Sequence, residues 1–169
     1  MEAIIFCGIQ GSGKSTFYKQ RFGDTHVRIN LDMLRTRKRE EILLQACLEA
    51  KQRFVVDNTN PTIESRRRYT EPALEAGFRL ASYYFETPVG DAITRNLGRP
   101  PKERVLPGSI VRTHKGLEPP EKREGFDQLL VARVDGNGGF EVEEMSIPFA
   151  ALGGENATDG GEGNEAGRG

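Results

Sequence analysis

The sequence predicts an α/β fold with a mainly parallel central sheet flanked by helices. Short apolar runs alternate along the chain with segments that have the apolar spacing of a helix, which is typical of strands that lie parallel in one sheet. A glycine-rich loop at residues 8–15 joins the first apolar run to a helical segment. The 169 residues fit one domain and leave little room for a second.

The expected elements follow from this alternation. The first apolar run ends at a glycine, as a buried parallel strand does. The expected strands lie at 3–7, 27–30, 53–57 and 80–85, and the expected helices at about 14–22, 31–51, 60–77 and 89–97. In the second helix the apolar stripe is Ile42, Leu43, Ala46, Cys47 and Ala50.

Proline and glycine mark the limits of the third helix. Asn60 followed by Pro61 resembles an N-cap with proline at the first helical position. Gly77 is placed to end the helix. Pro72 falls inside it, so a kink or a break is expected there.

Residues 98–123 differ from the rest of the chain. They hold five prolines among many basic residues, which predicts a mobile lid with one short helix near Ile110. Beyond the lid, residues 126–134 and 140–142 flank the turn sequence 135–139, and we expect them to form a hairpin.

The last 17 residues, 153–169, contain seven glycines and almost no apolar side chains. They are expected to be disordered, which makes 1–152 the folded domain. No apolar run reaches about 18 residues, so no membrane partner is expected. Cys7 and Cys47 fit no metal-ligand spacing and are expected to be buried, reduced thiols in a cytoplasmic protein.

The glycine-rich loop has the spacing of a phosphate-binding loop. Gly8, Gly13, Lys14 and Ser15 match the pattern G-x-x-x-x-G-K-[ST] after a strand and before a helix. The pattern predicts backbone N–H groups around the phosphates of ATP, a lysine on the β- and γ-phosphates and a serine hydroxyl on Mg²⁺. The residues expected to bind ATP here are Gly8, Gly11, Ser12, Gly13, Lys14, Ser15 and Thr16.

Two acidic residues follow the second and third strands. Asp32 lies in Asn30-Leu31-Asp32 and Asp57 begins Asp57-Asn58-Thr59-Asn60. Because strand carboxyl ends meet at one edge of a parallel sheet, both are expected near the γ-phosphate. One carboxylate would take the acceptor's proton and the other would organise Mg²⁺. The alternative is that each only caps the following helix.

Two groups of arginines are further candidates. Arg95 and Arg99 are four residues apart, which places them on one helix face beside the lid. They are either solvated charges or the cations that neutralise the transferring phosphoryl group. For the run 66–68, a solvated helix face is expected, and contact with a phosphate backbone is the alternative.

The chain resembles the kinase module of polynucleotide 5′-kinases, including the kinase half of polynucleotide kinase–phosphatases. The resemblance runs over about residues 1–135. The matching segments are 8–16, Asn30-Leu31-Asp32 with Arg35, Val55 to Pro61, and Arg95-Asn96 with Arg99, with looser matches at 104–107 and 124–126. It implies a P-loop kinase fold that uses Mg²⁺ and ATP and acts on the 5′-OH end of DNA or RNA.

The resemblance also implies roles for single residues. Asp32 would be the general base, and Arg95 and Arg99 would stabilise the transferring group, Arg99 as part of the ATP site. The acceptor side would use Arg35, Asp57, Asn58 and Asn60, and the metal side Ser15 and Asp57. Arg35, three residues after Asp32, is expected on the same helix face and would bind the acceptor's phosphate.

The sequence departs from the polynucleotide kinase pattern in two ways, and two other functions remain open. The sequence has no Asp-x-Asp-x-[TV] phosphatase motif, so no 3′-end processing is expected of these residues. The lid holds more proline than the resemblance predicts, which leaves the acceptor open. The rivals are a kinase of a small metabolite or nucleoside, and a nucleotide-gated binding protein that hydrolyses ATP slowly.

Overall fold

The computed structural model describes residues 1–146. The predicted tail at 153–169 and the end of the domain at 152 lie outside the described residues. The elements are β1 (Glu2–Cys7), α1 (Lys14–Arg21), β2 (Val27–Ile29), α2 (Leu31–Leu34), α3 (Arg37–Glu49), β3 (Phe54–Val56), α4 (Ile63–Glu75), β4 (Arg79–Phe85), α5 (Val89–Leu97), η1 (Pro101–Glu103), α6 (Pro107–Lys115), η2 (Lys122–Glu124), β5 (Gln128–Val134) and β6 (Phe140–Glu144).

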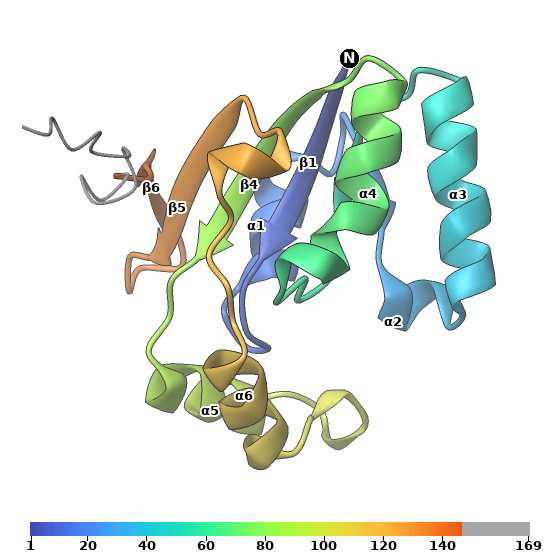
Figure 1. The fold of residues 1–169 in the computed structure, drawn as a ribbon. Helices are drawn as coiled ribbons and strands as arrows, with labels where there is room; N and C mark the ends of the chain where they lie inside the picture. Colours follow the sequence, from blue (N-terminus) through green and yellow to red (C-terminus); the bar gives the residue numbers. More distant parts are fainter. Residues whose placement is uncertain (147–169) are drawn as a thin grey trace, which may run out of the picture.

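The predicted sheet is confirmed. Its order is β2-β3-β1-β4-β5-β6; the first five strands are parallel and β6 runs antiparallel to β5. β1 lies in the middle with β3 and β4 on either side, so the loop after β1 leaves the sheet at the centre of its carboxyl edge (Figure 1). The predicted closing hairpin is also present, and Val134 pairs with Phe140.

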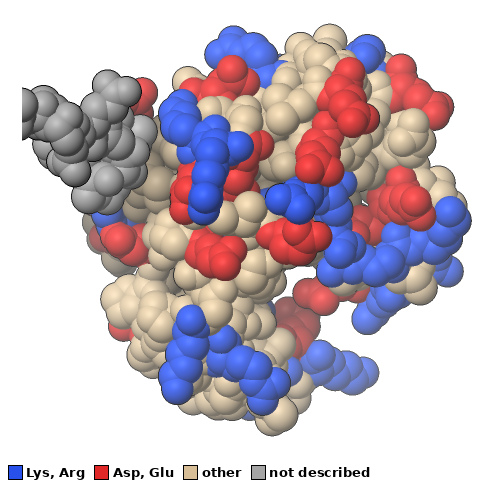
Figure 2. Space-filling model, viewed as in Figure 1, with Lys and Arg blue, Asp and Glu red and all other residues tan. Residues whose placement is uncertain are grey.

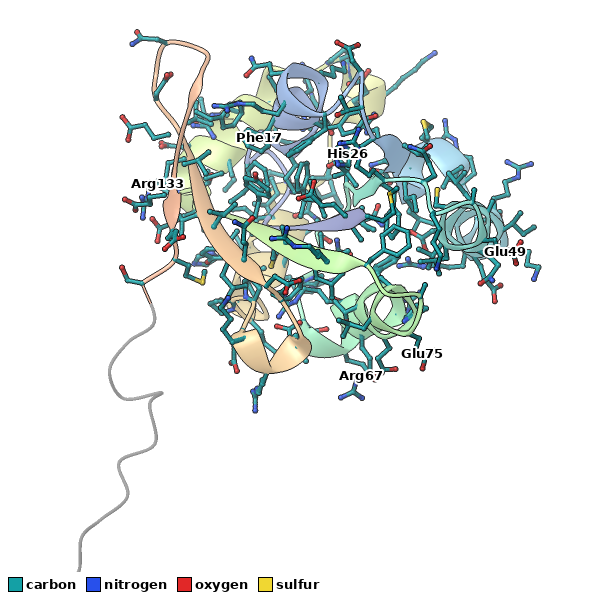
Figure 3. All side chains as sticks on the ribbon, turned by 90° about the horizontal axis from the view of Figure 1, so that it is seen from above. Phe17, His26, Glu49, Arg67, Glu75 and Arg133 are labelled. Atoms are coloured by element: carbon teal, nitrogen blue, oxygen red, sulfur yellow. The ribbon has the colours of Figure 1, made fainter. Side chains whose placement is uncertain are left out.

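Helices cover both faces of the sheet. α3 and α4 lie over one face and α1 lies over the other (Figures 1 and 3). Because strand side chains alternate, Ala3 and Ile5 of β1 pack with the α3 and α4 side, and Ile4 and Phe6 pack with Phe17 of α1. Both cysteines are buried, as expected. No helix within residues 1–146 is long and apolar enough to cross a membrane.

The prediction of one helix over 31–51 is wrong. α2 ends at Leu34, and Arg35 takes a left-handed backbone conformation with φ 73°. Thr36 then caps a new helix by accepting a hydrogen bond from the N–H of Arg39. The expected stripe is correct only in part. Cys47 is buried and Leu43 packs against the core, but Ile42 is 58% exposed, and the other buried residues of α3 are Glu40, Leu44 and Leu48.

The start of the helix after β3 was also predicted incorrectly. Thr62, not Asn60, caps α4, in a capping box with Ser65. Asn60 instead has φ 42° and donates a hydrogen bond from Nδ2 to the carbonyl of Phe6. Pro72 does not break the helix, which continues to Glu75. Gly77 follows the helix with φ 75°, as predicted.

The lid segment contains more helix than predicted. The helix expected near Ile110 is α6, and two short 3₁₀ helices, η1 and η2, flank it. Ile110 is fully buried and packs with Ile9 and Ala92. This small apolar cluster joins the glycine-rich loop, α5 and α6, so the lid helices lie against the loop at the carboxyl edge of the sheet (Figure 1).

Candidate active site

The glycine-rich loop follows β1 and needs its glycines for backbone geometry. Gly11 and Gly13 have φ values of 78° and 94°, which residues with a Cβ rarely adopt. A Cβ on Gly11 would also lie 2.4 Å from the carbonyl oxygen of Ala92. Gly8 is packed too closely for a side chain, because a Cβ there would lie 2.8 Å from the Cβ of Phe85.

The helix after the loop begins as an anion site does. Gly13 is the N-cap residue of α1 and offers no side chain to its N–H groups, and the first turn has no acidic residue. The first N–H groups of the helix and its positive dipole end therefore face the loop without a side-chain cap. Such an end favours a phosphate. Thr16 lies further along α1 and is exposed.

The side chain of Lys14 folds back over the loop. Its Nζ donates to the carbonyls of Gly8 and Ile9, at 2.9 and 2.6 Å, and to the hydroxyl of Ser12 at 3.2 Å. Burial lowers the pKa of Lys14 to about 8, although the nearby carboxylate of Asp57 raises it. Its ammonium thus already points into the loop, and a phosphate would replace oxygen partners that it now has.

Ser15 and Asp57 meet on the other side of the loop. The hydroxyl of Ser15 donates to Oδ2 of Asp57 at 3.0 Å, and Asp57 is 2% exposed. Arg28 of β2 binds both groups, with Nη2 2.8 Å from the Ser15 oxygen and 2.5 Å from Oδ2 of Asp57. Two hard oxygen ligands fit Mg²⁺, which takes one or two carboxylates together with substrate phosphates and water. The guanidinium of Arg28 occupies the same carboxylate oxygen.

Side-chain amides fix α2, which carries Asp32. Asn30 caps this helix through the N–H of Met33 and donates Nδ2 to the carbonyl of Asp57. Asn58 accepts the N–H of Leu31 at 2.8 Å. Because Asn30 is the cap, the alternative that Asp32 caps the helix is excluded. Asp32 is exposed on the first turn of α2.

The predicted convergence of the two strand ends is confirmed. A polar hollow of about 110 Å³, the phosphate-loop pocket, lies between the loop and these strand ends. It is lined by Gln10 to Ser15, Asn30, Asp32, Asp57, Asn58, Thr59, Arg99, Glu103 and Val105. A second hollow of about 230 Å³ adjoins it, and we name it the acceptor pocket for the role that the resemblance implies. Its lining includes Asp32, Arg37, Asn58, Asn60, Ser65 and Tyr69.

Asp32 lines both hollows. A group bound at the phosphate loop and a group bound in the acceptor pocket would therefore both lie next to this residue. Gln10, Asn58, Thr59 and Val105 also form part of both walls. This shared wall is the geometry that a transfer between two ligands requires.

Arg95 and Arg99 both lie at the site, but not on one helix as predicted. α5 ends at Leu97, so Arg95 and Arg99 do not share a helix. Both still lie at the loop, because Nη1 of Arg95 donates to the carbonyl of Gly11 at 3.3 Å and Arg99 lines the phosphate-loop pocket. Arg35 is not on the helix face of Asp32, because it follows the end of α2, and it lines neither pocket.

Sequence reasoning missed several residues of this site. Arg28 lies within a three-residue strand, and its only signal was a lone charge two residues before Asn30. Gln10 lines both pockets; its Nε2 donates to Thr113 of α6, and its Oε1 is buried without a partner among the described residues. Glu40 is 3% exposed and accepts hydrogen bonds from Arg37, Asn58 and Tyr69. Burial raises the pKa of Tyr69 to about 12.

The expectation that residues 66–68 form a solvated face is wrong for Arg66. This side chain is fully buried and binds both carboxylate oxygens of Glu124, at 2.7 and 2.8 Å. It also donates to the carbonyls of Asn60 and Glu118. Arg66 therefore ties α4 to η2 and to the backbone that follows β3, while Arg67 and Arg68 are exposed as expected.

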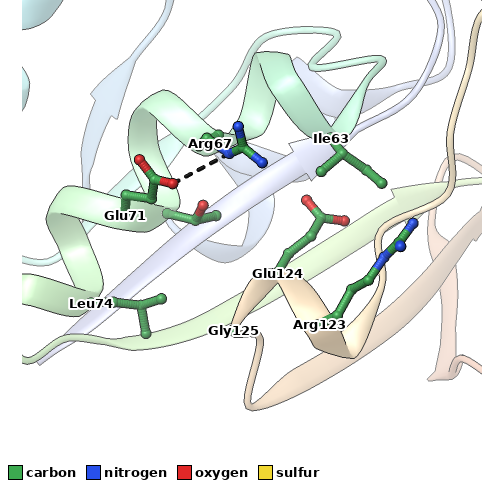
Figure 4. A pocket seen from close by; sticks show the side chains of 8 residues that line it. Ile63, Arg67, Glu71, Leu74, Arg123, Glu124 and Gly125 are labelled. Atoms are coloured by element: carbon green, nitrogen blue, oxygen red, sulfur yellow. Dashed lines mark ion pairs between the residues drawn. The ribbon is translucent and has the colours of Figure 1, made fainter.

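A larger pocket lies away from this site. It measures about 510 Å³, between α4 and η2 (Figure 4). Its charged side chains have ion partners: Arg67 pairs with Glu64 and Glu71, and Arg123 pairs with Glu121. Since these charges are already paired, the phosphate-loop and acceptor pockets remain the candidate site.

Comparison with known proteins supports a phosphate-binding loop at residues 8–15. A family model described as an AAA domain matches residues 4–119. The putative bifunctional polynucleotide phosphatase/kinase of Acanthamoeba polyphaga mimivirus is 31% identical over 139 residues. The bifunctional polynucleotide phosphatase/kinase of Schizosaccharomyces pombe is 29% identical over 135 residues. Each alignment covers 76% of this chain and 32% of the relative, so the chain spans about a third of the length of these curated relatives.

The fold is shared with a solved kinase. The crystal structure of a gluconokinase from Sinorhizobium meliloti 1021 superposes with a TM-score of 0.56 over 79% of this chain and 83% of that chain, at 18% identity. At this identity the likeness concerns the fold alone, which is that of a P-loop kinase. The curated relatives confirm the resemblance that the sequence motifs indicated.

Proposed function

The chain belongs to the AAA domain family that matches its residues 4–119, and from this premise we propose that it is an ATP-dependent polynucleotide 5′-hydroxyl kinase. The general part of this assignment, a P-loop phosphotransferase, follows from the family and its relatives. The acceptor, a 5′-OH end of DNA or RNA, is the finer proposal. The observation that carries the transfer reaction is the position of Asp32 on the wall between the phosphate-loop pocket and the acceptor pocket, and the polynucleotide acceptor is supported by the names of the two curated relatives.

The proposed reaction uses this shared wall. The 5′-hydroxyl oxygen bonds to the γ-phosphorus of ATP as the bond between that phosphorus and the ADP oxygen breaks, and Asp32 takes the hydroxyl proton. Lys14, Arg95 and Arg99 would neutralise charge on the transferring group. Asn58 and Asn60 line the acceptor pocket, where the terminal nucleotide would lie.

Ser15 and Asp57 would hold Mg²⁺, which would neutralise negative charge on the phosphates of ATP. Their oxygen atoms are 3.0 Å apart, and both groups are suitable magnesium ligands. Arg28 already binds the carboxylate oxygen of Asp57. Every side-chain hydrogen bond that Asp57 makes within residues 1–146 is on Oδ2, so Oδ1 would be the oxygen offered to the metal, with the guanidinium of Arg28 beside it.

The test measures transfer from labelled ATP to four acceptors: a 5′-OH oligonucleotide, a nucleoside 3′-monophosphate, a bare nucleoside and gluconate. We expect the first two to be phosphorylated and the bare nucleoside to be a poor acceptor. If gluconate or the bare nucleoside is the best acceptor, the chain is a metabolite kinase and the polynucleotide assignment is wrong. If ATP is hydrolysed equally with and without every acceptor, the nucleotide-gated binding protein becomes the better interpretation.

A further inference from the structure

Three hollows lie in a row across the face that carries α2, α3 and α4. The phosphate-loop pocket and the acceptor pocket share the wall that contains Asp32. The acceptor pocket and a third hollow of about 250 Å³ share Arg37 and Tyr69. This third hollow, the α3–α4 groove, is lined by Arg37, Glu40, Glu41, Leu44, Arg68 and Tyr69. A chain-like ligand that begins at Asp32 therefore has a route onward past Arg37.

Arg37 lies between the acceptor pocket and the α3–α4 groove, and part of its guanidinium makes no hydrogen bond to the residues that the structure describes. Its Nη1 donates to Glu40 at 2.7 Å and to the hydroxyl of Tyr69 at 3.1 Å, which uses both hydrogens of that nitrogen. Among residues 1–146, no partner engages its Nε or Nη2, and the side chain is 55% exposed. Nε and Nη2 form one side of the guanidinium fork, which matches two oxygens of a phosphate.

The acids at this boundary do not oppose an anion strongly. Glu40 is buried, and Arg37, Asn58 and Tyr69 satisfy both of its oxygens. Glu41 pairs with Lys38 at 3.3 Å. The buried carboxylate of Glu40 thus serves to hold the Arg37 side chain in place.

Arg68 lies on the α4 side of the groove. It is exposed, and no hydrogen bond or ion pair engages it in the described part of the chain. Its neighbour Arg67 is engaged by Glu64 and Glu71 and lines the separate pocket of Figure 4. The space-filling view shows basic side chains gathered over α2 and the start of α3, beside the notch that separates them from the lid helices (Figure 2).

We propose that one strand of the acceptor runs from Asp32 through the acceptor pocket, across Arg37 and into the α3–α4 groove. The phosphate next to the 5′ end binds the free side of Arg37, and a following phosphate lies near Arg68. This proposal rests on the proposed function and makes it more specific. It also moves the phosphate contact from Arg35 to Arg37, because Arg35 lies at the C-terminal end of α2 and lines none of the three hollows.

The test compares kinetics with a nucleoside 3′-monophosphate and with a 5′-OH tetranucleotide. Arg37→Ala should raise KM about ten-fold for both acceptors, because both present the first phosphate. Arg68→Ala should raise KM for the tetranucleotide several-fold more than for the mononucleotide, because only the longer acceptor reaches the groove. Arg39→Ala and Arg67→Ala are matched controls that change a charge on the same helices outside the route.

A second variant and a binding measurement distinguish a lost phosphate contact from a misfolded protein. Arg37→Lys keeps a cation beside Glu40 but removes the fork, so it should fold with an unchanged melting temperature and still lose most of the affinity. Anisotropy of a fluorescent 5′-OH tetranucleotide, measured with ADP present, should rank the variants in the same order. The strand route is wrong if Arg35→Ala raises KM and Arg37→Lys does not, or if Arg68→Ala behaves as Arg67→Ala does. A wild-type chain that phosphorylates no nucleotide overturns the proposed function itself.

Discussion

The guanidinium of Arg28 donates two hydrogen bonds to one carboxylate oxygen of Asp57, from Nε at 2.9 Å and from Nη2 at 2.5 Å. Nη2 also binds the hydroxyl of Ser15, the other group proposed to hold Mg²⁺. The guanidinium of Arg28 is therefore hydrogen-bonded to both residues that are proposed to bind Mg²⁺. Since Asp57 is buried, this contact also satisfies a carboxylate that would otherwise lie unpaired in the protein interior.

Removing this cation should change the magnesium requirement. Arg28→Gln removes a positive charge beside Ser15 and Asp57 and with it the repulsion between that charge and the metal, so we expect the Mg²⁺ concentration for half-saturation to fall by about ten-fold. Titration of Mg²⁺ into the ADP-bound protein, followed by calorimetry, measures this directly. Arg53→Gln, at an exposed position, is the control. A higher magnesium requirement in Arg28→Gln would mean that Arg28 assists the metal.

The buried ammonium of Lys14 predicts a pH dependence of ATP binding. Its pKa is lowered to about 8, so above pH 8 the unliganded protein increasingly holds a neutral lysine. Bound phosphates favour the charged form, and binding above pH 8 should therefore take up a proton and weaken by up to about ten-fold per pH unit. Calorimetry at pH 8.5, in two buffers with different heats of ionisation, measures the uptake.

Lys14→Ala is the control for that measurement and has an effect of its own. Its ATP binding should lack the proton uptake, and its rate of phosphoryl transfer should fall about 10²–10³-fold, which is typical for the loss of one electrostatic contact to a reacting group. Its melting temperature should be close to that of the wild type. Near-normal turnover by the purified variant would contradict the assignment of the phosphate loop.

Asp32→Asn tests the general base. Asn30 caps α2, so this substitution leaves the cap in place, and the amide has nearly the shape of the carboxylate. We expect kcat to fall at least about 10²-fold, with the dissociation constant for ADP within about two-fold of the wild-type value. Asp24→Asn changes an exposed acid that lines neither pocket and should have no effect. Substantial kinase activity in Asp32→Asn would require another base.

Arg66→Met tests the buried ion pair between α4 and η2. The side chains of Arg66 and Glu124 are 0% and 3% exposed, and removing the arginine leaves a buried carboxylate without its cation. We expect the free energy of unfolding in urea to fall by about 3–5 kcal/mol. Arg67→Met, next to it but exposed, should change stability by less than about 0.5 kcal/mol. Equal stability of Arg66→Met and wild type would show that the pair is dispensable.

Apolar periodicity and glycine positions were sufficient to predict the sheet, the phosphate loop and the closing hairpin. The rule that parallel strands end at one edge was sufficient to bring Asp32 and Asp57 together. Partners distant in sequence decided the rest. Glu40 can be buried because Tyr69 of α4 and Asn58 of the loop before α4 donate hydrogen bonds to its carboxylate. Arg66 can be buried because Glu124, 58 residues away in the sequence, pairs with its guanidinium.

The break between α2 and α3 was missed for a more local reason. Leu31 to Lys51 keeps a helical apolar spacing, but Thr36 offers a side-chain cap that lets a second helix begin in a new direction. Because α2 ends at Leu34, Arg35 does not lie on the same helix face as Asp32. The break also brought Arg37 to the wall of the acceptor pocket.

Phe140 of β6 packs beside the phosphate loop, and this contact sets a lower limit on the length of a fragment that keeps the site intact. Its ring lies 4.9 Å from that of Phe17 on α1, and a Cβ on Gly13 would come within 3.0 Å of it. The family match ends at residue 119, before β5 and β6 begin. A recombinant piece cut at that boundary would lose the aromatic ring behind the phosphate loop, so expression of the catalytic unit should extend at least through residue 144.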